Sequence, residues 1–174
     1  MWVHRSGEFY RERPIVIYEY QKGRDHQKPL SFYKDYKGIL VTDGLQQYHL
    51  VDKKLPRVTN ANCWAHAGRD FADAVKAMDK NDPSAVRNSV AYVALQKIGE
   101  FYNADTELKG LSPEERLQKR QETIQRLVED FFAWVKEQLS QCTVPPKSKT
   151  GQGLQYLVNQ ELYLKVFLTD GDVP

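Results

Sequence analysis

The sequence has few cysteines and no apolar run long enough to cross a membrane. Its two cysteines, Cys63 and Cys142, lie far apart and form no metal-type pair. This usage excludes a disulfide framework and indicates a reducing compartment. No apolar stretch approaches the roughly 20 residues of a membrane span, and the N-terminus lacks the apolar core of a signal peptide. We therefore expect a soluble, cytoplasmic protein without a membrane partner.

The sequence also lacks a strong excess of either charge. Its formal net charge is only +2 over 174 residues. This composition permits a nucleic-acid partner through local basic patches but does not require one. The hydrophobic share of 41% is enough for one well-buried domain, and two small domains are possible. Neither a repeat nor a low-complexity tract interrupts the chain.

Both ends of the sequence look cut. Residues 1–4 are strand-like from the first position, without a preceding cap or turn. Residues 170–174 stop in a turn that leads elsewhere. We expect a fragment of a longer protein.

The first part of the chain is predicted to be rich in strands. Residues 14–20 place apolar groups on both faces, which predicts a strand inside a covered sheet, after a turn around residues 6–8. The apolar run at 38–42 predicts a second strand buried on both faces. The expected elements are, in order, strands at 1–5 and 14–20, a helix at 29–36, strands at 38–42 and 57–64, and a helix at 67–78.

The second part is predicted to be helical. Asp82 and Pro83 form an N-cap and first-turn pair for a helix that reaches Phe101. Residues 112–115, Ser-Pro-Glu-Glu, form a capping box for a second helix that extends to Leu139. Pro145 and Pro146 end this helical hairpin. A last helix is expected over residues 154–168.

Strands followed by helices predict an α/β fold with helical cover and a helical hairpin inserted late. We divide the chain into a core part over residues 1–82, a helical insertion over 83–146, and a C-terminal helix over 147–174 that returns to the core.

Asp43 is the leading candidate for a functional residue. It follows directly on the apolar strand and precedes Gly44. One interpretation is an ordinary Asp-Gly turn. The other is a carboxylate ligand for Mg²⁺ or Mn²⁺, because these hard cations prefer oxygen donors and a strand end lies at the rim of a sheet.

His66 and Arg69 are candidates for phosphate contact. One Cys and one His at positions 63 and 66, with no second pair, do not make a structural zinc site. A buried Cys63 and Trp64 that close a strand are the better interpretation. His66 and Arg69 would then lie near the N-terminus of the following helix, where backbone N–H groups attract anions.

Lys147 and Lys149 precede two glycines, in a composition like that of a phosphate-binding loop. The glycine spacing fits neither a P-loop nor a dinucleotide fingerprint. We predict an exposed basic turn, with contact to the DNA backbone as the alternative.

Several short segments spread over nearly the whole chain form one specific combination. They are residues 1–3 and 5–7, 15–21, 41–44 and 48–49, 63–67 with Arg69 and Phe71, 111–116, 131–134, 145–151, 159–160, 167–168, and 170–171. This combination resembles the transposases of the insertion sequence 66 family. The family is known for an RNase H-like catalytic domain with a DDE triad, three carboxylates that hold two divalent metals.

The resemblance implies a function in DNA transposition by a bacterial mobile element. It implies an RNase H-like mixed sheet that lacks its first strand in this chain, with Mg²⁺ or Mn²⁺ as cofactor of the full-length enzyme. Asp43 matches the second aspartate of the triad. The DNA partners would be transposon ends and target DNA, and a homo-oligomer is compatible with the resemblance.

The sequence departs from the family pattern in three places. The first aspartate of the triad lies before Met1, the glutamate lies after Pro174, and Gly68 stands where an arginine is expected. One carboxylate cannot organise two metals, so we expect these 174 residues alone to be inactive. Glu161 and Asp170 are nearby carboxylates, but neither matches a motif that would make it a candidate metal ligand. Whether the chain is an enzyme thus depends on its parent protein.

Two alternatives stay open. The chain could be a truncated, non-catalytic remnant that acts at most as a DNA- or protein-binding module. It could also belong to a nuclease of RNase H type outside transposition, which would share the fold and the metals.

Overall fold

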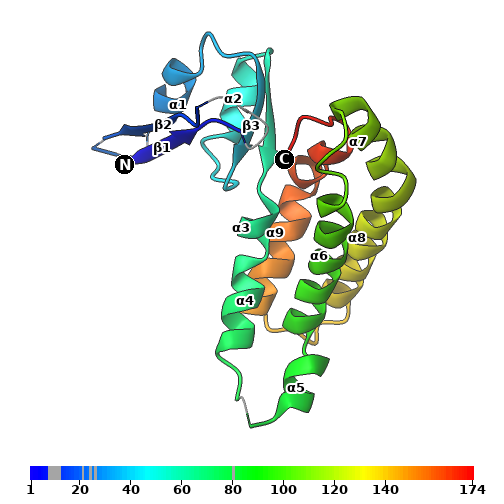
Figure 1. The fold of residues 1–174 in the computed structure, drawn as a ribbon. Coiled ribbons are helices and arrows are strands. Elements are labelled where there is room, and N and C mark those ends of the chain that lie inside the picture. Colours follow the sequence, from blue (N-terminus) through cyan, green and yellow to red (C-terminus); the bar gives the residue numbers. More distant parts are fainter. Residues whose placement is uncertain (8–12, 21, 24, 26, 80) are drawn as a thin grey trace.

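The computed structural model describes residues 1–7, 13–20, 22–23, 25, 27–79 and 81–174. Figure 1 shows a small part that contains strands and short helices, next to a longer bundle of helices. The elements of the first part are β1 (Trp2–Arg5), β2 (Val16–Glu19), α1 (Gln27–Phe32), β3 (Gly38–Thr42), α2 (His49–Lys54) and β4 (Val58–Asn62).

The helical bundle follows β4 directly. Its elements are α3 (Trp64–Ala67), α4 (Arg69–Lys76), α5 (Pro83–Asn88), α6 (Val90–Thr106), α7 (Pro113–Lys119), a π-helical turn (Arg120–Ile124), α8 (Gln125–Ser140), α9 (Lys149–Leu164) and a 3₁₀ turn (Val166–Leu168). The fold is α/β, as predicted. No helix of the described residues is long and apolar enough to span a membrane.

The strands form two separate sheets rather than one mixed sheet. β1 pairs with β2 in antiparallel fashion, and β3 pairs with β4 in parallel fashion. In the described part of the chain, neither β1 nor β3 has a second strand neighbour. The four predicted strands exist, but the one expected at 57–64 ends at Asn62. Cys63, which is only partly buried, caps α3, and Trp64 begins that helix, so the expectation that both residues close the strand is wrong. The turn predicted between the first two strands extends to Glu8, which lies outside the described residues.

The predicted burial of two strands is wrong. In β2, Val16, Ile17 and Tyr18 are 44%, 45% and 67% exposed. In β3 only Thr42 is buried, and Val41 is 40% exposed. The apolar residues are present as the sequence predicts, but the β2 residues and Val41 are exposed. Ile39 and Leu40 of β3 are only partly buried, each against one of the two cores.

Helix α2 has no counterpart among the helices expected from the sequence. It connects the two strands of the parallel pair, which cannot be joined by a tight turn. Val51 is its only fully buried residue and packs with Val58 and Tyr33 in a small core under the second sheet. With six residues and one buried position, α2 is too short for its apolar residues to show a helical repeat.

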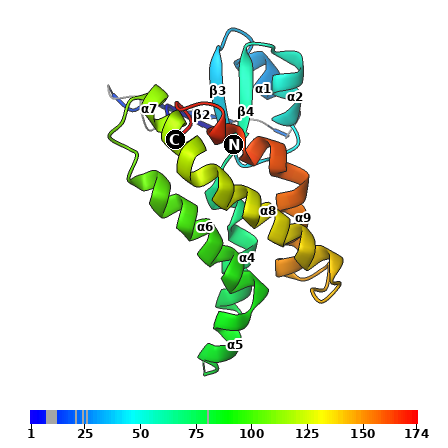
Figure 2. The same ribbon diagram turned by 90° about the vertical axis from the view of Figure 1, so that its right-hand side faces the viewer.

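The main core lies in the helical bundle, where α9 packs against α4 and α8 (Figure 2). Trp64 anchors the junction with β4: its indole N–H donates to the carbonyl of Leu164 at 2.9 Å, and its ring meets Phe101 edge-on. The buried apolar residues around it include Phe71, Phe131, Phe132, Leu154 and Leu157.

The predicted helices exist, with different bounds. The helix expected at 29–36 spans Gln27–Phe32, and the one expected at 67–78 is divided at Gly68 into α3 and α4. Ser89 divides the helix after Asp82 into α5 and α6, because it serves as the N-cap of α6. Asp82 and Ser112 cap their helices as predicted, and Ser112 and Glu115 form the capping box.

Candidate functional site at the end of strand β3

A groove of about 1630 Å³ separates the two sheets. All residues of β1 and of β3 line it, whereas β4 contributes none. The edges of β1 and β3 that have no strand neighbour in the described chain therefore face each other across this space. Figure 1 shows the two sheets on either side of it.

Asp43 lies on the rim of this groove, directly after β3, and its side chain is exposed. One carboxylate oxygen accepts a hydrogen bond from the backbone N–H of Leu45 at 3.1 Å. Gly44 follows with φ +79°, a left-handed conformation that glycine adopts readily. This geometry agrees with the turn interpretation. It is also compatible with a ligand role, because the Asp43 side chain is exposed at the rim.

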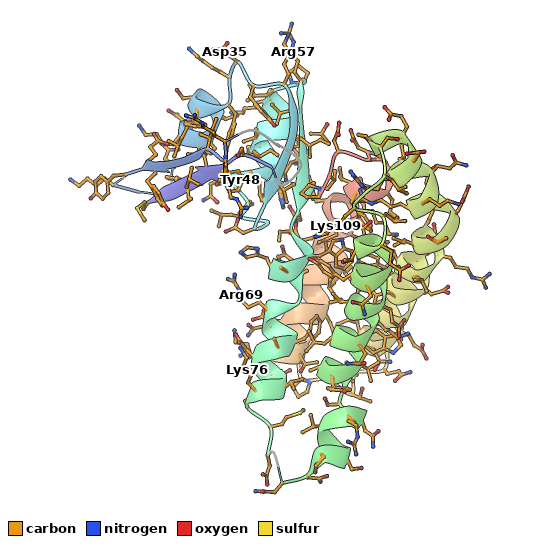
Figure 3. The ribbon with its side chains drawn as sticks, viewed as in Figure 1. Asp35, Tyr48, Arg57, Arg69, Lys76 and Lys109 are labelled. Carbon is orange, nitrogen blue, oxygen red and sulfur yellow. The ribbon has the colours of Figure 1, made fainter. Side chains whose placement is uncertain are left out.

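Two tyrosines surround the Asp43 turn. The hydroxyl of Tyr156, on α9, donates to the backbone carbonyl of Asp43 at 3.1 Å. Burial, together with the negative charge of Asp43, raises the pKa of Tyr156 to about 12, and the same two causes raise the pKa of Tyr48 to about 12. Both hydroxyls are therefore protonated at neutral pH, and that of Tyr156 acts as a donor to the Asp43 turn. Figure 3 shows Tyr48 between the two sheets.

A buried polar network holds the base of this turn. The hydroxyl of Thr42 lies 3.1 Å from the amide oxygen of Asn60 and 3.3 Å from that of Asn62. The amide nitrogen of Asn62 donates to Gln160 of α9 at 2.9 Å. A side chain in place of the hydrogen of Gly44 would collide with the hydroxyl of Tyr156. The turn is thus fixed from both β4 and α9.

Sequence reasoning missed the residues of this network as site residues. Tyr156 and Gln160 lie 113 and 98 positions from their partners Asp43 and Asn62. No local pattern connects positions so far apart. The one available signal was the Asn159-Gln160 pair, which carried part of the family resemblance.

Of the four candidate DNA contacts, only His66 lines the same groove as Asp43. It lies on α3, and its Nδ1 is buried without a hydrogen-bond partner among the described residues. Arg69 begins α4 and is exposed, and Figure 3 shows it on the outer side of that helix. The groove is not lined by Arg69, Lys147 or Lys149.

The expected basic turn at 147–153 is replaced in large part by α9. Ser148 caps the helix by accepting from the N–H of Gly151 at 3.1 Å, and Lys149 is its first residue. The Nζ of Lys149 lies 2.8 Å from a carboxylate oxygen of Asp70, and this pair raises the pKa of Lys149. Gly151 and Gly153 are buried. Only Lys147 lies in an exposed turn.

The residues present do not by themselves fit a two-metal centre. The described part of the chain contains no group of three or more His, Cys, Asp or Glu that could hold a metal ion. Asp43 supplies one carboxylate, and Cys63 and Cys142 are free thiols that are not grouped with further ligands.

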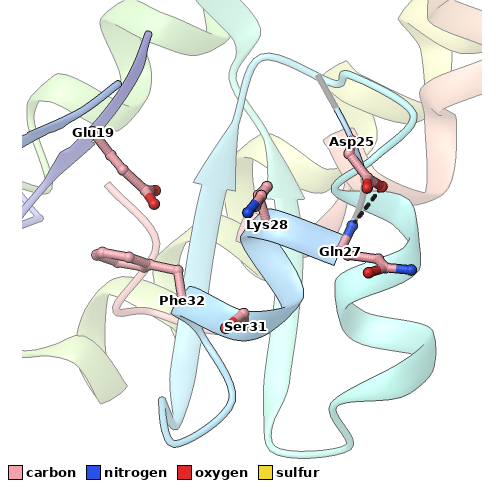
Figure 4. Close-up of a pocket in the computed structure, with 6 residues that line it drawn as sticks. All are labelled: Glu19, Asp25, Gln27, Lys28, Ser31 and Phe32. Atoms are coloured by element: carbon pink, nitrogen blue, oxygen red, sulfur yellow. Dashed lines mark hydrogen bonds between the residues drawn. The ribbon is translucent and has the colours of Figure 1, made fainter. Parts of the chain in front are cut away.

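A second, smaller cavity of about 450 Å³ lies beside α1 (Figure 4). Its lining mixes polar side chains with the ring of Phe32. Asp25 at its edge accepts from the N–H of Gln27 at 3.0 Å and so marks the start of α1. The charged groups Glu19, Asp25 and Lys28 point in different directions in the close-up, and they form no converging site.

Fold and site together define an α/β protein with one exposed carboxylate at the carboxyl end of a parallel strand, on the rim of an open groove. The chain matches the model of the transposase IS66 family over residues 1–174. It belongs to this family, as the resemblance predicted.

Two curated relatives come from Sinorhizobium fredii (strain NBRC 101917 / NGR234). The uncharacterized protein y4hP is 29% identical over 167 residues, and the uncharacterized protein y4qI is 27% identical over 166 residues. Each match covers 92% of this chain but only 30% and 29% of the relative. The chain therefore spans less than a third of the length of these relatives. No solved structure matches the chain.

Proposed function

We propose that this chain is part of the catalytic region of a DDE-type DNA transposase, and that Asp43 is one of the carboxylates that hold the divalent metals. Membership of the IS66 transposase family supports a transposase-related function. The observation that carries the proposal further is the position of Asp43 directly after β3, where its exposed side chain lies at the groove rim.

The groove supports an RNase H-like sheet that is completed by a further strand. β1 and β3 face it with edges that have no strand partner in the described chain, and unpaired edges are templates for strand addition. An additional strand between them would join the antiparallel and the parallel pair into one mixed sheet. The curated relatives are long enough to supply such a segment elsewhere in the parent protein.

The same segment would bring the first carboxylate next to Asp43. Mg²⁺ or Mn²⁺ bound between such carboxylates activates the attacking hydroxyl and stabilises the leaving oxygen in phosphodiester chemistry. In this chain, the donors from Tyr156 and the Thr42–Asn62–Gln160 network orient the Asp43 turn. The isolated chain, with only one carboxylate that matches the triad, would bind DNA at most and would cut none.

The test uses the full-length parent protein. We expect Mg²⁺-dependent strand transfer on DNA that carries the element ends, and an activity lower by at least about 10³-fold in Asp43→Asn, because a lost metal ligand removes several kcal/mol of transition-state stabilisation. Asp52→Asn, on α2, is the matched control and should retain activity. Full activity of Asp43→Asn would refute the assignment of the residue.

A second measurement separates the alternatives. Parent protein that binds DNA without metal-dependent cleavage would identify a non-catalytic binding module. Cleavage of random duplex or RNA–DNA hybrid as well as of element ends would identify a nuclease of RNase H type instead of a transposase.

A further inference from the structure

Two buried arginines of the helical insertion hold the segment that follows α9. Arg120, in the π-helical turn after α7, is fully buried, and Arg116 is 2% exposed. Buried guanidinium groups are rare unless they are paired and hydrogen-bonded. Both side chains point to the turn formed by residues 166–173, and most of their hydrogen bonds go to backbone carbonyls.

Arg120 makes the larger set of contacts. One side of its guanidinium binds Asp105 of α6 through two hydrogen bonds, of 2.6 and 2.9 Å, which balance its charge. The remaining nitrogen, Nη1, donates to three backbone carbonyls, of Phe167 at 3.1 Å, Asp170 at 3.3 Å and Val173 at 2.9 Å. The guanidinium of Arg120 thus contacts three backbone carbonyls of the turn at once.

Arg116 holds the same turn at a different point. It donates to the carbonyl of Gly171 at 2.6 Å and to those of Leu111 and Leu108 at 2.9 and 3.4 Å. Gly171 lies so close to Pro113, at the start of α7, that a Cβ there would collide with the proline backbone. The turn therefore lies directly against the N-terminal end of α7.

The held segment forms part of the wall of the groove between the sheets. Asp170, Asp172 and Pro174 line it together with Asp43 and His66. In Figure 1 the C-terminal segment (red) lies between the sheets and α7. The insertion thus places the turn after α9 at the same opening that Asp43 occupies.

We infer that Arg116 and Arg120 form a clamp through which the helical insertion positions the chain after α9 at the groove. Arg120 and Arg116 are positioning residues in this view: they act on the backbone of residues 166–173 and touch neither metal nor DNA. The consequence for catalysis rests on the proposed function. The clamp would fix the part of the groove wall that Asp170, Asp172 and Pro174 form, relative to the proposed metal ligand Asp43.

Arginine suits this role better than lysine. Its planar fork can bind a carboxylate with one edge and carbonyls with the other, whereas an ammonium group is a single compact donor centre. Arg120→Lys therefore keeps the charge beside Asp105 but cannot reach both sets of acceptors. Arg116→Lys is a second variant that leaves the Arg120–Asp105 pair intact. Arg126→Lys, on the exposed face of α8, is the matched control.

The direct test measures the position of the turn. Nitroxide labels are attached at Asp172→Cys and Lys53→Cys, two exposed positions, with Cys63 and Cys142 replaced by alanine and serine. Pulsed electron paramagnetic resonance then reports the distance between the turn and α2. We expect one narrow distance with native arginines and with Arg126→Lys, and a broad distribution with Arg120→Lys and Arg116→Lys. An unchanged distribution in a folded Arg116→Lys or Arg120→Lys would overturn the clamp.

The consequence is tested in the parent protein by the metal dependence of strand transfer. We expect the half-saturating Mn²⁺ concentration to rise about tenfold in Arg120→Lys relative to Arg126→Lys, the size typical of losing a group that supports a metal ligand. If the half-saturating Mn²⁺ concentration were unchanged although the distance distribution had broadened, the arginines would have no positioning role for the metal site. If the native parent protein showed no strand transfer, the proposed function would be refuted. The distance measurement would still test whether Arg116 and Arg120 hold the turn in place.

Discussion

Gly153 of α9 packs so closely on Phe71 of α4 that its replacement by alanine should destabilise the protein. A Cβ at position 153 would lie 2.9 Å from Cζ and 3.0 and 3.2 Å from the two Cε atoms of the Phe71 ring. Phe71 is fully buried, so its ring has no free space to move into. The close approach of α9 and α4 therefore depends on the missing side chain.

The expected magnitude combines two opposing effects. Alanine stabilises a helix interior by about 1 kcal/mol relative to glycine. Overpacking of a filled core costs about 1–3 kcal/mol, and distances below 3.0 Å place this contact at the upper end. We expect Gly153→Ala to lower the free energy of unfolding by about 1–2 kcal/mol.

Gly99 of α6 provides a matched control, because a Cβ there would meet no atom within 4 Å. Gly99→Ala should raise the free energy of unfolding by about 0.5–1 kcal/mol through helix propensity alone. Both variants are compared with the native chain by urea unfolding, followed by circular dichroism. The difference between them isolates the packing contribution.

A double variant tests the assigned cause. Phe71→Leu removes the ring atoms that would collide, so Gly153→Ala should cost less in that background than in the native one, with a coupling above about 0.5 kcal/mol. If Gly153→Ala were as stabilising as Gly99→Ala, the packing argument would be refuted. The close packing of Gly153 against α4 would then be refuted as well.

Two further predictions concern stability. Burial lowers the pKa of His49, whose ring stacks on Tyr163 at 4.1 Å, so the contribution of neutral His49 to the free energy of unfolding should be complete above about pH 6.5 and decrease as the pH falls. In urea unfolding at several pH values, His49→Phe should therefore lose less stability on acidification than the native chain. Equal losses in the two proteins would contradict this. Ser112→Ala removes the cap that accepts from Glu115 N–H at 3.2 Å and should lower the free energy of unfolding by about 1 kcal/mol in the same assay, whereas Ser140→Ala, at the exposed end of α8, should change it little.

The parts of the fold that short-range chemistry decides could be predicted from the sequence. The Asp82-Pro83 pair and the capping box at Ser112 each marked a helix start, because a cap acts within three residues of the helix. The apolar run ending at Asp43 gave β3. Family membership, predicted from scattered short segments, is confirmed over the whole chain.

Properties that depend on distant partners could not be predicted. The exposure of β2 and Val41 depends on which layers cover them, and apolar composition does not report this. The contact between Tyr156 and Asp43, and that between Arg120 and the turn at 167–173, connect segments that share no local pattern. The metal-ligand role of Asp43 and the DNA contacts of His66, Arg69, Lys147 and Lys149 stay predictions, as does the division at residues 82 and 146.

The π-helical turn at Arg120–Ile124 sets the rotational phase between α7 and α8. The inward positions Arg116, Arg120, Ile124 and Val128 follow one another at intervals of four residues. In a regular α-helix each such step overshoots a full turn by about 40°, so three steps would rotate the last position about 120° away from the first. The wider turn absorbs much of this excess. Deleting one residue there would turn either the arginines or the apolar face of α8 toward solvent. The number of residues between α7 and α8 is therefore tightly constrained.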